Sequence, residues 1–239
     1  MDWQGLACLQ KVSTVGANPG KGAELRLGRA SLLAAALIAG LVITATALAG
    51  KDFRFSTNPP DKQYDYFHPG RHGGQLLHNV EQAHLVPGIR QLAEGDFRHA
   101  HNSLDFVLRW YPNHPRALNL YSQLAMKRGQ PDSALAYLDY ALRFRPRDLS
   151  THIIYGIHRY RMGDFRKAAG RFREALDLDP QSAEAHYNLG LTYVELREYD
   201  KARAQARKAY DLGYPLPGLR EKLRDRGEWP RTSTASAPR

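Results

Sequence analysis

A repeat of 34 residues constrains this 239-residue chain more than any other feature of its sequence. Between Leu149 and Ser182 the sequence reads as two short amphipathic helices joined by a Gly163-Asp164 turn and closed by Pro180. The same order of apolar, small and turn-forming residues returns when the window is moved by 34 residues in either direction. Because one such unit cannot bury its apolar face alone, neighbouring units are expected to stack into a continuous core.

The spacing within a unit has a physical reason. A small residue in the first helix, such as Gly156 or Gly190, lets the second helix pack closely against it. Ala168, Phe172 and Ala175 then share one stripe of the second helix, where Phe172 is expected to fill the gap to the next repeat. The frames begin near Glu81, Pro115, Leu149 and Ala183 and predict repeats over 81–114, 115–148, 149–182 and 183–214.

This pattern resembles the tetratricopeptide repeat family, whose helix–turn–helix units have the same period. The resemblance implies an all-α fold, a right-handed solenoid of about four repeats within residues 75–214. It also implies a scaffold or adaptor that binds a peptide or helix of a partner protein in its concave groove. An assembly factor or chaperone for a secretion or pilus-like system is the alternative role.

Both ends of the array depart from the pattern. Pro87 falls in the middle of the first helix of its frame, so we expect a helix from about Gln75 that kinks or restarts at Pro87 and caps the array. At the other end, segment 215–229 predicts a capping helix whose Leu219 and Leu223 cover the apolar edge of the last repeat. The final residues, 230–239, are expected to be disordered.

Residues 30–50 carry no charged side chain in 21 positions. A helix of this length, at about 1.5 Å per residue, crosses a hydrocarbon core of ~30 Å. The segment is therefore predicted to be either an uncleaved transmembrane anchor or a signal peptide cleaved after Ala49, where Ala47-Leu48-Ala49 matches the small-x-small pattern.

Either reading has the same consequence for the repeats. Residues 1–29 are predicted to be disordered and to remain cytoplasmic, because Arg26 and Arg29 precede the apolar segment. The repeats are then expected outside the cytoplasm, in the periplasm of a bacterial envelope. They would be held at the cell membrane by a single span, or be released from it by cleavage.

Residues 51–74 predict an irregular linker arm. The Pro59-Pro60 and Gly73-Gly74 pairs argue against regular structure, whereas Tyr64, Tyr66 and Phe67 argue against a purely solvated spacer. We expect the arm to pack partly onto the first repeat.

Histidines are concentrated in and after this arm. Seven of the ten lie between positions 68 and 114, namely His68, His72, His78, His84, His99, His101 and His114. They could form a metal-binding or pH-responsive module, or they could be solvated or helix-capping side chains. Their spacing matches no recognised set of metal ligands, so we expect no metal and no cofactor.

The family's pattern places partner contacts on the first helix of each repeat. In this chain those positions are Arg116, Asn119, Gln123, Lys127, Ile153, Ile157, Tyr160, Arg161, Tyr187, Leu191 and Glu195. They predict a groove with a basic, polar entrance and an apolar, aromatic middle. Alternatively, Ile153 and Ile157 pack against the arm or a neighbouring helix.

Catalysis and nucleic-acid binding are not expected. Cys8 is the only cysteine and precedes the repeats, and the serines lie in no nucleophile motif, so we predict that the protein is not an enzyme. A net charge of +10 would favour acidic partners such as anionic lipid, an acidic protein or nucleic acid. Because the basic residues are spread over every repeat, we expect a protein partner and no nucleic acid.

Overall fold

The computed structural model describes residues 60–229, apart from the side chains of residues 71–73. The predicted segments 1–29 and 30–50, residues 51–59 of the arm and the tail 230–239 therefore lie outside the described residues. Among the helices of residues 60–229, none is both long and apolar enough to span a membrane.

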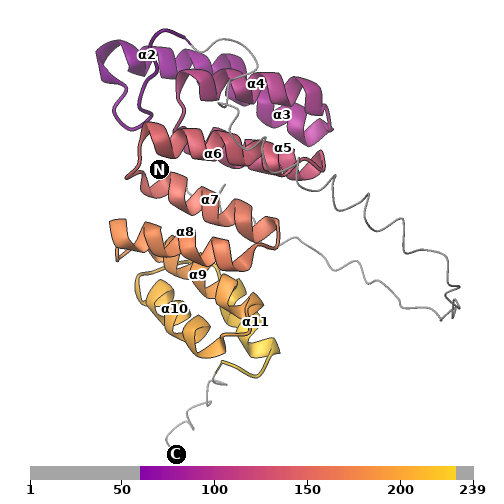
Figure 1. Ribbon diagram of the computed structural model, residues 1–239, viewed down its shortest axis with the longest axis vertical. Coiled ribbons are helices and arrows are strands. Elements are labelled where there is room, and N and C mark those ends of the chain that lie inside the picture. The colour runs from indigo at the N-terminus through magenta and orange to yellow at the C-terminus, as the bar shows by residue number, and fades with distance from the viewer. Residues whose placement is uncertain (1–59, 230–239) are drawn as a thin grey trace, which may run out of the picture. The chain divides into compact units, whose positions relative to one another are not determined.

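The described chain is a succession of helices joined by short turns (Figure 1). In order these are α2 (Gly70–Val80), the π-helical turn η3 (Glu81–Leu85), α3 (Val86–Glu94), α4 (Phe97–Trp110), α5 (Pro115–Lys127), α6 (Asp132–Phe144), α7 (Leu149–Arg161), α8 (Phe165–Leu178), α9 (Ala183–Glu195), α10 (Tyr199–Asp211) and α11 (Gly218–Asp225). Each first helix packs against its own second helix, and α7 also contacts α5 and α9. The all-α solenoid expected from the repeats is confirmed.

Three of the first helices begin at equivalent positions of the repeat. Helices α5, α7 and α9 start at intervals of 34 residues, and the residue before each is the N-cap. The side chains of His114, Asp148 and Ser182 accept hydrogen bonds there from backbone N–H groups of the first turn. These bonds satisfy donors that have no partner within the helix, and they fix where each helix begins.

Close approach of the two helices within a repeat requires a missing side chain. A Cβ added at Gly156 would lie 2.5 Å from Cε1 of Phe172, and one at Gly88 would lie 3.3 Å from Cδ2 of Leu104. Phe172 is fully buried, and its ring contacts Gly156 in its own repeat. The same core cluster includes Leu189 of the next repeat, so Phe172 also lies at the junction predicted from its spacing.

Helix α11 completes the last repeat. Ala206 occupies the position that Phe172 has 34 residues earlier, and it is too small to fill the space beside Gly190. Leu219 of α11 fills that space instead, because a Cβ at Gly190 would lie 2.5 Å from its Cδ2. Leu219 and Leu223 are both fully buried, so the predicted capping role of these leucines is confirmed.

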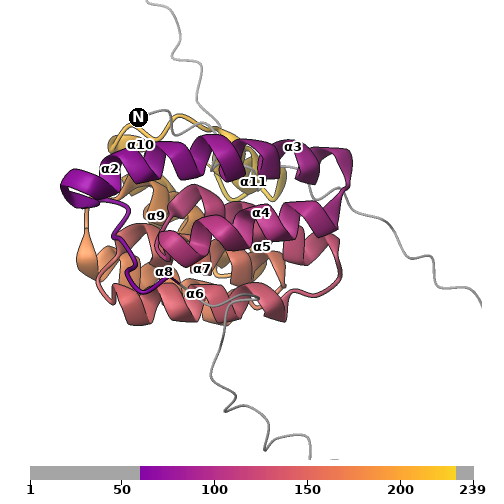
Figure 2. The same cartoon turned by 90° about the horizontal axis from the view of Figure 1, so that it is seen from above.

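The first helix differs from the prediction. It begins at Gly70, five residues before Gln75, so the Gly73-Gly74 pair lies inside α2 and the irregular arm ends at Pro69. Figure 2 shows α2, η3 and α3 following one another along one side of the repeats. Pro87 has no N–H for the usual helical bond, and the preceding turn accommodates it by π-type spacing, in which the Val86 N–H bonds the carbonyl of Glu81.

Two glycines in helices provide a matched test of this packing. Replacing Gly156 with alanine places a methyl group against the buried Phe172 ring, so we expect a loss of about 1–3 kcal/mol in the free energy of unfolding. Replacing Gly170 in α8 meets no atom within 4 Å and should instead add ~0.5–1 kcal/mol through helix propensity. Denaturant unfolding measures both. A similar change in the two variants would contradict the packing at Gly156.

Candidate partner-binding site

The structure divides the predicted contact residues into two groups. Arg116, Gln123, Lys127, Tyr160, Arg161 and Glu195 are exposed or half-buried, whereas Asn119, Ile153, Ile157, Tyr187 and Leu191 are buried. Ile153 and Ile157, the latter only 1% exposed, belong to the core cluster that also holds Phe172. The alternative that these two isoleucines pack inside the protein therefore agrees with the structure.

The predicted apolar middle of the groove does not form a surface. Tyr187 is 3% exposed because the ring of Tyr214 stacks on it, with 4.3 Å between the ring centroids. Leu191 packs in the same cluster as Leu219 and Leu223 of α11. In this conformation the C-terminal segment covers Tyr187 and Leu191, so neither side chain is open to a partner.

Several polar members of the predicted set join neighbouring repeats. Nη1 of Arg161 donates to Oδ1 of Asn119 at 3.0 Å and to Oγ of Ser122 at 2.8 Å, which ties α7 to α5. Ser122 stands where the other repeats have glycine, and its Oγ lies 2.8 Å from Nδ1 of the buried His158. The polar groups of these side chains are therefore bonded to one another.

A second polar cluster ties α7, α9 and α11 together. The hydroxyl of Tyr160 donates to Oε1 of Glu195 at 3.0 Å, and Nζ of Lys222 donates to the Tyr160 oxygen at 3.2 Å and pairs with Glu195. Burial alone would raise the pKa of Glu195, but Lys222 and Tyr160 lower it. Of the predicted set, Arg116, Gln123 and Lys127 on α5 remain the side chains most open to a partner.

The described part of the arm, residues 60–69, is fastened to the repeats. The N–H of Tyr64 donates to the carbonyl of Trp110 at the end of α4, at 2.9 Å. The side chain of Gln63 accepts a hydrogen bond from the Tyr140 hydroxyl on α6, at 2.7 Å. Packing of the arm onto the first repeat is confirmed, and the arm continues onto the second.

Asn113, in the turn between α4 and α5, is the centre of this attachment. It is 1% exposed, its Oδ1 accepts from the Tyr66 N–H at 2.9 Å, and its Nδ2 donates to Oδ1 of Asp65 at 2.7 Å. Oδ2 of Asp65 pairs with the Arg145 guanidinium and lies 3.1 Å from Nδ1 of His68. One carboxylate therefore joins the arm to two turns of the repeat array.

The electrostatics of Asp65 follow from these partners. Partial burial alone would raise its pKa, but the hydrogen bonds from Asn113, Arg145 and His68 lower the pKa to about 2. Since this lies below the ordinary value of 3.8, the ionised carboxylate contributes stability that is fully present above pH 3.8. That contribution is lost as the pH falls through about 2.

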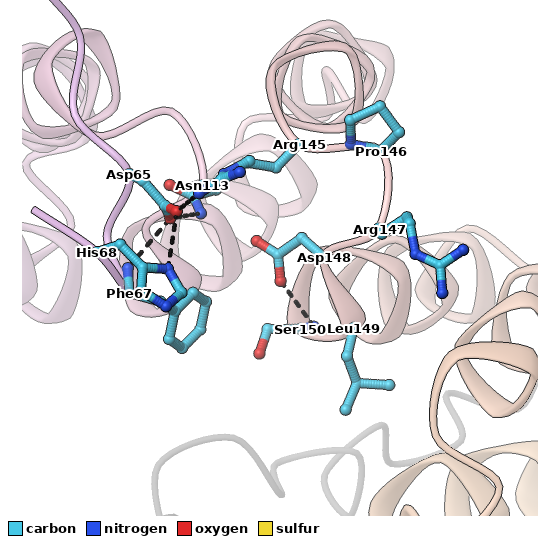
Figure 3. Close-up of a pocket in the computed structure, with 10 residues that line it drawn as sticks. All are labelled: Asp65, Phe67, His68, Asn113, Arg145, Pro146, Arg147, Asp148, Leu149 and Ser150. Atoms are coloured by element: carbon cyan, nitrogen blue, oxygen red, sulfur yellow. Dashed lines mark hydrogen bonds and ion pairs between the residues drawn. The ribbon is translucent and has the colours of Figure 1, made fainter.

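The arm and the turns that it crosses enclose a pocket of about 700 Å³ (Figure 3). Its walls come from the arm, from the α4–α5 turn and from the α6–α7 turn with the start of α7. The lining residues are Asp65, Phe67, His68, Asn113, Arg145, Pro146, Arg147, Asp148, Leu149 and Ser150. This volume is typical of pockets that bind small ligands or single side chains.

The pocket combines an apolar wall with basic groups. The Phe67 side chain stays 43% exposed, and Pro146 and Leu149 add apolar surface. Asp148 is occupied as the N-cap of α7, where its Oδ1 accepts from the Ser150 N–H at 3.0 Å. Asp65 pairs with Arg145 and Asp148 accepts from backbone donors, so the exposed Arg147 forms no ion pair within the described residues.

Sequence reasoning did not find this pocket. The aromatic residues of the arm indicated packing, but neither Asn113 nor Arg145 lies in a motif that predicts contact with Asp65. The only available signal was the exposed apolar Phe67 within a Pro- and Gly-rich segment.

Several of the described histidines have structural partners. Nε2 of His152 lies 3.0 Å from the carbonyl of Pro146, and Nε2 of His186 lies 3.0 Å from the carbonyl of Pro180, 34 residues later. His114 lies 3.1 Å from Oε1 of Glu81. Within residues 60–229 no three His, Cys, Asp or Glu side chains converge as a metal site.

Comparison with known proteins identifies the repeats. Two sequence models of the tetratricopeptide repeat family match the chain, one over residues 91–150 and the other over residues 156–215. The two matches together span 120 of the 239 residues, just over half of the chain. No curated protein matches the chain in sequence.

Solved structures of similar fold include the following two. A thermophilic tetratricopeptide repeat protein of Thermus thermophilus is 24% identical with a TM-score of 0.50, over 62% of this chain and 84% of that one. PilF of Pseudomonas aeruginosa is 21% identical with a TM-score of 0.51, over 64% of this chain and 71% of that one. Identities this low show the fold alone.

The attachment of the arm can be tested at Asp65. Asp65→Ala removes the acceptor shared by Asn113, Arg145 and His68, so we expect the arm to lose about 1–1.5 kcal/mol of local stability. Trypsin should then cleave after Lys62 about five- to tenfold faster, because cleavage requires local opening. Asp61→Ala, an exposed neighbour, is the control and should leave the rate unchanged. Equal rates in the two variants would contradict the role of Asp65.

Proposed function

Because this chain belongs to the tetratricopeptide repeat family, we propose that it is a non-enzymatic scaffold that binds a segment of a partner protein. Proteins built from these repeats generally mediate protein–protein interactions, and neither family match indicates a catalytic family. The proposal places the main contact in the pocket between the arm and the α6–α7 turn, rather than in the middle of the groove.

The exposed Phe67 ring is the main observation that supports this proposal. Phe67, Val86 and Leu212 are the large apolar side chains left exposed among the described residues, and of these Phe67 lines the 700 Å³ pocket. Aromatic side chains at the edge of a pocket are frequent anchors of protein interfaces. Hydrogen bonds of the arm hold this ring in place before a partner arrives, which lowers the ordering cost of binding.

The lining indicates the chemistry of the partner segment. An apolar side chain would fill the space between Phe67 and Leu149, and a neighbouring carboxylate would meet Arg147 at the rim. Arg145 contributes less, since Asp65 already pairs with its guanidinium. Arg116, Gln123 and Lys127 on α5 offer further polar contacts along the predicted face.

The proposal includes an extracytoplasmic location. Its support is the charge-free segment 30–50, which suits either a membrane anchor or a cleaved signal. Nine residues, 51–59, separate that segment from the described arm. At ~3.5 Å per extended residue, an uncleaved anchor would keep Pro60, where the described arm starts, within about 30 Å of the membrane.

A peptide selected by display against the full-length chain tests the pocket. Phe67→Ala should weaken its binding about five- to tenfold by removing an aromatic wall, with an unchanged melting temperature. Leu212→Ala is the matched control, since it removes an apolar side chain that is 41% exposed and lies away from the pocket. Isothermal titration of the three proteins gives the affinities.

The selected peptide can also contradict the proposal. If Phe67→Ala binds as tightly as the unchanged protein while Arg116→Ala or Lys127→Ala weakens binding, the partner lies along α5 and the pocket is not its main contact. Equal weakening by Phe67→Ala and Leu212→Ala would indicate nonspecific apolar adhesion.

The location can be tested with Cys8, the only native cysteine. In spheroplasts, a membrane-impermeant maleimide should label an Asp61→Cys variant at the introduced thiol but not at Cys8. Lysis should expose Cys8 if the anchor is retained, and cleavage after Ala49 would remove it. Labelling of the introduced thiol only after lysis would place the repeats in the cytoplasm and contradict the proposal.

A further inference from the structure

A second pocket lies where the first turn of α4 meets the C-terminal end of α5. Its volume is about 560 Å³, and its lining residues are Phe97, Arg98, His101, Lys127 and Arg128. It shares no residue with the pocket beside the arm. The three cationic side chains are all exposed, and no acidic residue lines the pocket.

The cations of this pocket form no ion pair within the described chain. Over residues 60–229, the ion pairs found do not include Arg98, Lys127 or Arg128. The neighbouring carboxylate of Asp96 is occupied, because it caps α4 and lies 2.6 Å from Nδ1 of His99. Three positive charges therefore converge on one concave space and raise its electrostatic potential.

His101 forms part of the pocket wall without adding a positive charge. Its Nδ1 lies 2.8 Å from the hydroxyl oxygen of Tyr121, which fixes the ring at the pocket wall. Burial lowers the pKa of His101. The nearby Asp105 carboxylate opposes this shift and the charge of Arg128 adds to it, and because the net shift is downward the ring stays uncharged near neutral pH. The half-buried ring of Phe97 supplies an apolar surface beside the cations.

Helix stability explains only part of this arrangement. Lys127 and Arg128 lie at the C-terminal end of α5, where cations are favourable. Arg98 lies in the first turn of α4, where the helix dipole disfavours a cation, and it faces two further positive charges. An anionic occupant would offset this repulsion.

Neither end of this chain has the charge to fill the pocket. The segments 1–59 and 230–239 contain three acidic residues, Asp2, Glu24 and Asp52, against eight lysines and arginines. A second copy is also disfavoured, because the whole chain carries a net charge of +10. These charges favour an occupant from another molecule.

We infer that this basic pocket binds a short acidic segment, rich in Asp and Glu, of a partner protein. The segment's carboxylates pair with Arg98, Lys127 and Arg128, and its methylene groups pack on Phe97. The cations cluster in one pocket, which suits a few adjacent carboxylates, whereas a nucleic-acid strand is usually followed by an extended basic track. This inference does not require the pocket beside the arm to bind anything.

Binding of a fluorescent octaglutamate peptide to the full-length chain tests the inference. Lys127→Glu/Arg128→Glu should weaken the affinity at low salt at least tenfold. Arg207→Glu/Lys208→Glu is the matched control, since it reverses the same two residue types, both exposed, near the C-terminal end of α10. The control should change the affinity less than about twofold. Phe67→Ala should have no effect, which separates this site from the arm pocket.

Three results would overturn the inference. Equal weakening by the two charge-reversed variants would show attraction to net charge alone, and no weakening by either would show that the pocket is not used. Tighter binding of oligothymidylate than of octaglutamate, lost in the pocket variant, would assign the pocket to nucleic acid. If the charge-reversed variant has a lower melting temperature, the neutral variant Lys127→Gln/Arg128→Gln is tested in its place. This variant must still weaken binding of the octaglutamate peptide several-fold, or the inference is overturned.

Discussion

The close approach of paired helices at a glycine is the constraint on which the rest of this structure depends. At Gly156 the Phe172 ring occupies the space that any Cβ would need. Where the second helix offers only Ala206, the space beside Gly190 must be filled from outside the repeat, and Leu219 of α11 fills it. Helix α11 is thus a structural part of the last repeat rather than an appendage.

The same constraint determines which surfaces remain for a partner. Once α11 is in place, Lys222 reaches Tyr160 and Glu195, and the C-terminal segment covers Tyr187. In the repeat that has Ser122 in place of glycine, a buried polar link to His158 and Arg161 replaces close packing. Much of the face that the family's pattern assigns to binding is therefore used to join repeats, and the two pockets that we propose for binding both lie at the ends of helices.

The repeats could be predicted from the sequence because they depend on local spacing. Gly156, Phe172 and Leu219 could each be assigned to packing from small and apolar residues at fixed intervals. Burial of Tyr187 could not be predicted, because it depends on Tyr214, which ends the last repeat frame and obeys no period. The hydrogen bond between Asn113 and Asp65 could not be predicted from the sequence either. The two residues are 48 positions apart, and a single hydrogen-bonded pair produces no periodic pattern in the sequence.

The central claim is that residues 60–69 are a fixed wall of the pocket, held by Asn113 and by the end of α4. Hydrogen–deuterium exchange of the full-length chain tests this most directly at the amides of Tyr64 and Tyr66, which donate to Trp110 and Asn113. The account predicts exchange at these two amides that is slowed to a degree comparable with the interior of α4. Exchange at the rate of an unstructured peptide, while α4 remains protected, would contradict it.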